Sequence, residues 1–187
     1  GGKQYTIYDK SGKVGYEVGA DIQYLLKNKF SLASGINLLQ TGGKFSVMSG
    51  YAGSTGGSQT EFPAVNTKSL SLEIPLKLGY DILLSDNFVL TPAVGLYGRY
   101  ALVSLKDKVS ITGDKGNHDW DCYKDFNKDM HHIDAMKKFE YGVVLGVGAK
   151  FANHYVLSLN YHRGLNSVSS QYDLKKSDVS CSIGYIW

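Results

Sequence analysis

The residues in this chain that come closest to a catalytic pair are Ser158 and His162, four positions apart in an alternating segment. A serine activated by a histidine is the nucleophile of many hydrolases, including enzymes that modify lipids. In an extended strand, however, four positions span about 13 Å, which is too far for a direct hydrogen bond. No third residue that would orient the histidine is evident. We therefore expect no catalytic residues and no enzyme; an enzyme that modifies lipid or lipopolysaccharide is the alternative.

Acidic residues and histidines also gather in the longest polar segment, between about residue 106 and residue 136. They are Asp119, Asp121, Asp125, Asp129, His131, His132 and Asp134. Their spacing matches neither an EF-hand nor a zinc site. We expect a solvated loop that holds no metal ion and no other cofactor.

The same polar segment contains three aromatic residues, Trp120, Tyr123 and Phe126. Aromatic side chains among polar ones are typical of contact surfaces. These three residues are the candidates for contact with an extracellular ligand, although they could equally pack the loop against its neighbours.

Isolated charges recur among glycines and other small residues on one face of the alternating segments. They are Glu17, Asp21, Glu73, Lys77, Arg99, Glu140 and Lys150. Glycine inside a strand gives nothing to pack, so this face does not resemble a water-facing surface. It fits the interior of a narrow barrel, where charges pair with one another. Because eight strands leave just enough room for side chains, we expect a structural charge network; a narrow porin-like conduit is the alternative.

Seven segments of the chain alternate apolar and less apolar residues with the period of a β-strand. They begin near residues 14, 30, 70, 88, 138, 155 and 178. Short turns near residues 27–29, 85–87 and 153–154 alternate with long polar connections at about 42–67, 106–136 and 164–176, of which residues 44–48 could extend a strand. This repetition predicts one all-β domain over residues 1–187 with an antiparallel up-and-down architecture.

The apolar face has aliphatic residues in the middle of the strands and aromatic residues near both ends. The girdle at the short-turn end comprises Tyr24, Phe30, Tyr80, Phe88, Phe151, Tyr155, Tyr185 and Trp187. The girdle toward the long loops comprises Tyr16, Tyr100, Phe139 and Tyr161. Two aromatic girdles around an aliphatic band are typical of a barrel that spans a bilayer. Strands of roughly ten residues also suffice to cross a bilayer at a tilt, which favours a membrane barrel over a soluble one.

Charge and composition argue against two further classes, a nucleic-acid-binding protein and a protein with a transmembrane helix. The formal charge is +3 and no Lys/Arg cluster marks a face for nucleic acid. No run of 18 apolar residues is present, which excludes a transmembrane helix. The two cysteines, Cys122 and Cys181, lie in unlike surroundings and are not favoured to pair.

Residues 72–76 read Leu-Glu-Ile-Pro-Leu and are followed by Leu-Gly-Tyr at 78–80, and the last strand ends on an aromatic residue. These segments, together with residues 139–148 and 161–165, resemble the PorT-like outer-membrane β-barrel family of Bacteroidetes. The resemblance implies an eight-stranded, OmpX-like barrel in the outer membrane of a Gram-negative bacterium, in contact with outer-membrane lipid. It also implies that the barrel assembly machinery recognises the C-terminal strand. The family is defined by its barrel more than by an activity, so we expect a structural or surface-binding role in the cell envelope.

The strand count leaves one strand unassigned. Closed single-chain bacterial barrels have an even number of strands, whereas seven are secure here. Upstream of Val14, only residues 3–8 alternate, and this segment is too short to cross a bilayer. We therefore expect the first strand to be short or missing.

Overall fold

The computed structural model describes residues 4–12, 14–50, 59–105, 107–110, 117–128, 131–152, 154–170 and 173–185. Its strands are β1 (Gln4–Gly12), β2 (Val14–Leu25), β3 (Phe30–Gly50), β4 (Gln59–Tyr80), β5 (Ile82–Ser85), β6 (Phe88–Ser104), β7 (Asp107–Ser110), β8 (Asn117–Trp120), β9 (Phe126–Lys128), β10 (His131–Ile133), β11 (Phe139–Phe151), β12 (Tyr155–Gly164) and β13 (Ser177–Tyr185). A short 3₁₀ turn, η1 (Lys27–Lys29), joins β2 to β3. Within the described residues no helix is long and apolar enough to cross a membrane.

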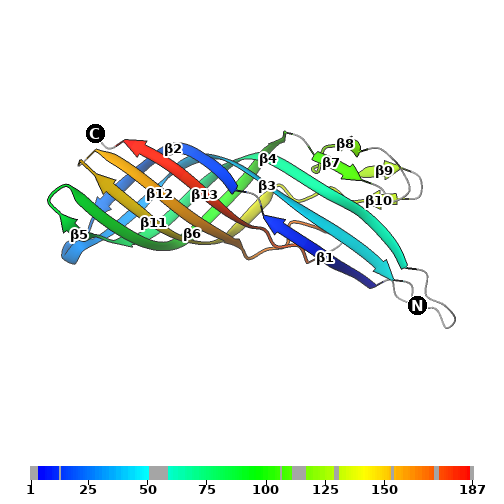
Figure 1. The fold of residues 1–187 in the computed structure, drawn as a ribbon, viewed down its shortest axis with the longest axis horizontal. Helices are drawn as coiled ribbons and strands as arrows, with labels where there is room; N and C mark the ends of the chain where they lie inside the picture. Colours follow the sequence, from blue (N-terminus) through cyan, green and yellow to red (C-terminus); the bar gives the residue numbers. More distant parts are fainter. Residues whose placement is uncertain are drawn as a thin grey trace.

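Seven of these strands close into a barrel. The order around the wall is β2, β3, β4, β6, β11, β12 and β13, with antiparallel pairing at every step (Figure 1). The wall closes where residues 14–16 of β2 pair with residues 179–181 of β13, and this last pairing is parallel. An odd number of up-and-down strands must give a parallel closure, because the first and last strands then run in the same direction. The predicted all-β, antiparallel up-and-down barrel is confirmed, and the described chain closes it with seven strands.

The two faces of the wall follow the alternation of the sequence. In β11, for example, Leu145 is 52% exposed whereas its neighbour Val144 is 1% exposed. Ile74 and Leu76 of β4 likewise point away from the barrel interior and are 55% and 51% exposed. A continuous band of outward aliphatic side chains would aggregate in water and suits hydrocarbon. The apolar face therefore forms the outside of the molecule, not a core.

The interior of the barrel is narrow, and glycine is needed where strands pass closely. A Cβ atom at Gly95 would lie 2.1 Å from the Leu76 carbonyl oxygen, and one at Gly142 would lie 2.2 Å from the Arg163 carbonyl oxygen. Both distances are far below van der Waals contact, so any other residue would push neighbouring strands apart. The glycines on the less apolar face thus allow the wall to curve tightly.

A long hairpin of β3 and β4 projects beyond the barrel at the end away from the C-terminus (Figure 1). Its pairing runs from Phe30 and Tyr80 to Gly50 and Gln59. The predicted extension of a strand through residues 44–48 is confirmed. The long connection expected over the rest of residues 42–67 was wrong for 42–43, 49–50 and 59–67, because the hairpin continues past the barrel rim, and residues 51–58 lie outside the described part. β1 pairs with residues 43–50 of β3 in this projection, so the upstream segment lies alongside the hairpin and does not enter the barrel wall. We call β1 and the projecting parts of β3 and β4 the outer arm.

The long loops at the same end also contain regular structure. β7 pairs with β4 and with β8, and β9 pairs with β10, so the described part of the polar segment over residues 106–136 contains four short strands. Four apolar side chains from the two long loops are buried: Cys122, Met136, Val168 and Leu174. Backbone bonds from Met136 to Cys122 (2.7 Å) and from Lys137 to Val168 (2.7 Å) hold these segments together. Both cysteines are free, Cys122 buried and Cys181 exposed.

Candidate functional site

The centre of the barrel interior is Arg99, whose side chain is 3% exposed. Its Nε and Nη2 donate to Glu73 Oε2 at 2.9 and 2.7 Å, and its Nη1 donates to Asp178 Oδ1 at 2.8 Å. Arg99 Nη1 also lies 3.6 Å from Glu140 Oε1. Glu73 and Glu140 stand directly opposite Arg99 on the two neighbouring strands, β4 and β11. Asp178 comes from β13, so the guanidinium links one side of the wall to the other.

His162 of β12 joins the same group from a further strand and is 1% exposed. Its Nε2 lies 3.2 Å from Glu73 Oε1, and its Nδ1 lies 3.2 Å from Asp178 Oδ2. The Nδ1 contact is short enough for an ion pair but lacks hydrogen-bond alignment. Both ring nitrogens therefore face carboxylates, an arrangement suited to an imidazole that carries two N–H groups.

Tyr97 completes the group. Its hydroxyl donates to Glu140 Oε1 at 2.5 Å, and its ring lies edge-on to His162 with centroids 5.1 Å apart. The Arg99 guanidinium carbon lies 4.8 Å from the centre of the same ring. Tyr97 thus shields one side of the guanidinium and supplies a donor to the third carboxylate.

We call these six residues the charged cluster: Glu73, Tyr97, Arg99, Glu140, His162 and Asp178. They come from five of the seven barrel strands. Each residue is at most 3% exposed, except Asp178, which is 6% exposed. A buried charge without partners costs several kcal/mol, so each member depends on the others. With its side chains bonded across the interior, the cluster fills this level of the barrel.

Glu17 of β2 lies next to the charged cluster and links three strands. It accepts a hydrogen bond from Asn37 Nδ2 of β3 at 2.6 Å and one from Ser180 Oγ of β13 at 2.8 Å. The bond to Ser180 crosses the parallel closure of the barrel. Glu17 therefore supports the closure at the point where the backbone ladder is shortest.

Glu17, Glu73 and His162 bring three possible metal-ligand atoms within 4.8 Å of one another. Each carboxylate already accepts hydrogen bonds, Glu17 from Asn37 and Ser180, and Glu73 from Arg99. The guanidinium supplies positive charge where a cation would otherwise lie. This donor set fits a hydrogen-bonded cluster better than a metal centre.

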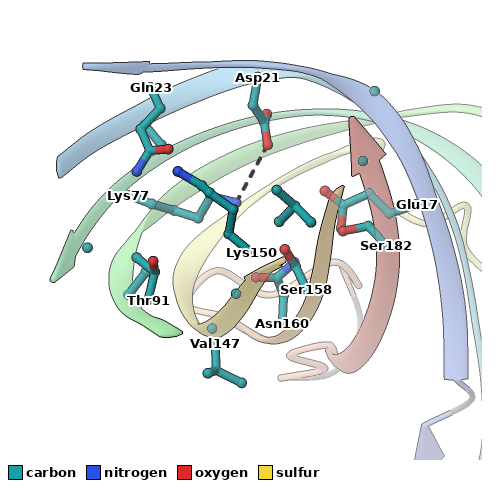
Figure 2. A pocket seen from close by; sticks show the side chains of 18 of the residues that line it. Glu17, Asp21, Gln23, Lys77, Thr91, Val147, Lys150, Ser158, Asn160 and Ser182 are labelled. Atoms are coloured by element: carbon teal, nitrogen blue, oxygen red, sulfur yellow. Dashed lines mark ion pairs between the residues drawn. The ribbon is translucent and has the colours of Figure 1, made fainter. Parts of the chain in front are cut away.

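Toward the short-turn end, the interior widens into a cavity of about 390 Å³, which we call the lumen cavity (Figure 2). Lys77, Lys150 and Asp21 line it together with small residues and hydroxyl groups. Lys77 Nζ lies 3.9 Å from Asp21 Oδ2, and the two side chains are 15% and 43% exposed. Figure 2 shows this ion pair, with Lys150 reaching into the same cavity.

The structure divides the seven predicted interior charges between two places. Glu73, Arg99 and Glu140 belong to the charged cluster, with Glu17 beside it. Asp21, Lys77 and Lys150 line the lumen cavity.

The sequence prediction missed three members of the charged cluster: Tyr97, His162 and Asp178. The alternation of the strands already indicates that two of them face the interior. Tyr97 lies two positions before Arg99, and Asp178 lies two positions before Ser180, so each shares a face with an interior residue. His162 was considered only as a partner for Ser158. In the structure its nitrogens face carboxylates, while Ser158 lines the lumen cavity.

The predicted aromatic residues are placed as follows. Tyr24, Phe30, Tyr80, Phe151 and Tyr155 are exposed on the outside of the barrel, between 40% and 68%, and Phe88 is half-buried. Tyr185 belongs to β13, but its side chain is outside the described part of the structure, as is all of Trp187. At the opposite end, Tyr16, Tyr100, Phe139 and Tyr161 are 42% to 62% exposed.

Of the three aromatic loop residues predicted to contact a ligand, the structure describes the side chain of one, Tyr123. Tyr123 is half-buried, and Lys138 Nζ lies 5.8 Å from the centre of its ring. Trp120 belongs to β8 and Phe126 to β9, and their side chains lie outside the described part. Among the loop acids, Asp121 accepts the Tyr123 amide at 3.1 Å and Asp125 accepts the Ala135 amide at 2.7 Å. These two carboxylates thus shape the loop itself.

A closed strand order, an outward aliphatic band between exposed aromatic residues and an interior filled by bonded charges define a class of protein, the bilayer-spanning β-barrel. The chain matches the family model described as an outer membrane protein β-barrel domain over residues 2–170, and it belongs to that family. Membership indicates an outer-membrane location. No curated protein and no solved structure shows significant similarity to the chain.

Proposed function

We propose that this chain is a small, non-conducting and non-enzymatic barrel of the PorT-like or OmpX-like type in the outer membrane of a Gram-negative bacterium. Its role is to hold the outer arm and the long loops above the membrane, where they contact another surface or an extracellular ligand. The barrel assembly machinery and outer-membrane lipid are its partners within the envelope. The observation that carries this proposal is the charged cluster, which fills the interior at the level of the outer girdle.

The outer end of the molecule supports a role in contact. The arm is a continuous extension of the barrel wall, and the two long loops share buried apolar side chains and backbone bonds. Segments organised in this way present a surface of fixed shape, which lowers the entropic cost of binding.

Conductance in planar bilayers tests the proposal. The chain should insert without producing current steps, because the charged cluster leaves no continuous aqueous path. The triple variant Glu73→Ala/Arg99→Ala/Glu140→Ala shortens three of the six side chains of the cluster and serves as a control that should conduct if it folds. Reproducible current steps from the unmodified chain would instead favour the porin-like conduit.

The enzyme alternative has its own test. Phospholipid and lipopolysaccharide hydrolysis should be no higher for the chain than for Ser158→Ala and His162→Ala. An activity that both substitutions abolish would replace the proposed role with catalysis.

The contact role is tested by shortening the outer arm. Deleting residues 45–63 removes its distal part and leaves the barrel segments of β3 and β4 intact. Cells that display the full chain should adhere to surfaces or to one another more strongly than cells with the shortened arm. Equal adhesion would remove the contact role and leave a structural role.

A further inference from the structure

The lumen cavity places two lysines in a bilayer-spanning barrel. Lys77 from β4 and Lys150 from β11 both line it, and only Lys77 has an ion-pair partner, Asp21, among the described residues (Figure 2). Lys150 precedes Phe151 of the short-turn girdle, and its ammonium group is available to a ligand that enters the cavity.

The acidic residues around the cavity do not balance the two ammonium groups locally. Glu17 also lines the cavity, but its two oxygens are held by Asn37 and Ser180 beside the charged cluster. Among the residues that line the half of the cavity toward the short turns, two ammonium groups thus face the one carboxylate of Asp21; Asp81, behind this lining, accepts a hydrogen bond from Thr91 Oγ1 at 2.7 Å. The lining of this half carries a surplus of positive charge.

Hydroxyl groups add neutral donors to the same space. Ser158 of β12 and Ser182 of β13 line the cavity, and neither hydroxyl has a side-chain partner among the described residues. Two ammonium groups and two hydroxyls directed at one space match an anion with several oxygens, such as phosphate. The volume of about 390 Å³ is within the range of small-molecule sites.

The cavity also borders the weakest part of the barrel wall. β2 and β13 pair only over residues 14–16 and 179–181. The cavity-lining residues Asp21, Gln23 and Gly184 lie beyond that pairing, toward the short-turn end. A headgroup could therefore enter from the membrane between these two strands, and a soluble anion could enter from the short-turn end.

We propose that the lumen cavity binds a phosphate group through Lys77 and Lys150. The phosphate belongs either to the headgroup of an anionic phospholipid or to a soluble phosphate, and the chemistry at the two lysines is the same. This site is separate from the contact role of the outer arm and does not depend on it.

The full chain in detergent tests the proposal with two probes. Inorganic phosphate is titrated by calorimetry, and retention of phosphatidylglycerol against phosphatidylcholine is measured by native mass spectrometry. We expect one phosphate or one phosphatidylglycerol per barrel. Lys77→Gln and Lys150→Gln should each lower affinity about tenfold, as expected for loss of a charge-assisted contact. Lys150→Arg should retain most of the binding because it keeps the charge.

Lys27→Gln is the matched control, because it removes the same charge from the same end of the barrel but outside the cavity. Circular dichroism and heat-modifiable gel mobility identify variants that fold. Binding of phosphate identifies a soluble ligand, whereas binding of phosphatidylglycerol alone identifies a lipid. If neither probe binds, or if all folded Lys→Gln variants bind equally, the assignment is overturned.

Discussion

Arg99 is the residue whose removal should destabilise the barrel most. It donates four hydrogen bonds to two buried carboxylates and lies 3.6 Å from a third. In Arg99→Met, three buried carboxylates would remain with one imidazole between two of them. Breaking a buried ion pair by removing one partner costs about 3–5 kcal/mol. We expect a loss of about that size in the free energy of unfolding.

Urea unfolding of the chain in phospholipid vesicles, followed by circular dichroism, measures this loss. The chain offers a matched control in Arg163, next to His162 in sequence but exposed, with one bond to Ser177 Oγ at 2.7 Å. Arg163→Met should cost less than about 1 kcal/mol, as surface contacts usually do. If the two substitutions cost the same, the argument that buried charges hold the interior together is wrong.

Three further predictions follow from other contacts. Glu17→Ala should speed hydrogen exchange in β2 and β13 more than in β6, since it removes bonds across the closure; uniform exchange would count against this role. Gly95→Val should prevent the shift in gel mobility that marks a folded barrel, because its Cβ would meet the Leu76 carbonyl oxygen, and a normal shift would show that the wall can widen. A maleimide should leave Cys122 unlabelled until urea is added; rapid labelling of Cys122 would contradict its burial.

Much of the barrel could be predicted from the sequence because each strand carries its own evidence. A period of two in β4 and β11 determines which residues face outward, and Ile74 and Leu145 are exposed as that period requires. Burial in hydrocarbon reinforces the pattern, since every outward position meets the same apolar environment. Local sequence is then sufficient to assign the faces.

The details that failed depend on partners distant in the chain. β3 continues to Gly50 because β4 and β1 pair with it there. The sequence indicates a strand only at residues 44–48 of that segment and does not show which strands pair with it. The contact between Arg99 and Asp178 joins residues 79 positions apart and requires the wall to close. Alternation was enough to place both side chains inside the barrel, but it does not determine their level along the barrel axis, so it could not show that they contact each other.

The length of the outer arm has a consequence for how this protein would respond to salt. From Thr41, just past the outer girdle, to Gly50, ten residues of extended strand span about 33 Å. The Debye length at physiological ionic strength is about 8 Å. A partner held at the far end of the arm would therefore be beyond the electric field of the lipid headgroups. Its affinity would vary with ionic strength through its own charges and those of the arm, and would be the same over acidic and neutral membranes.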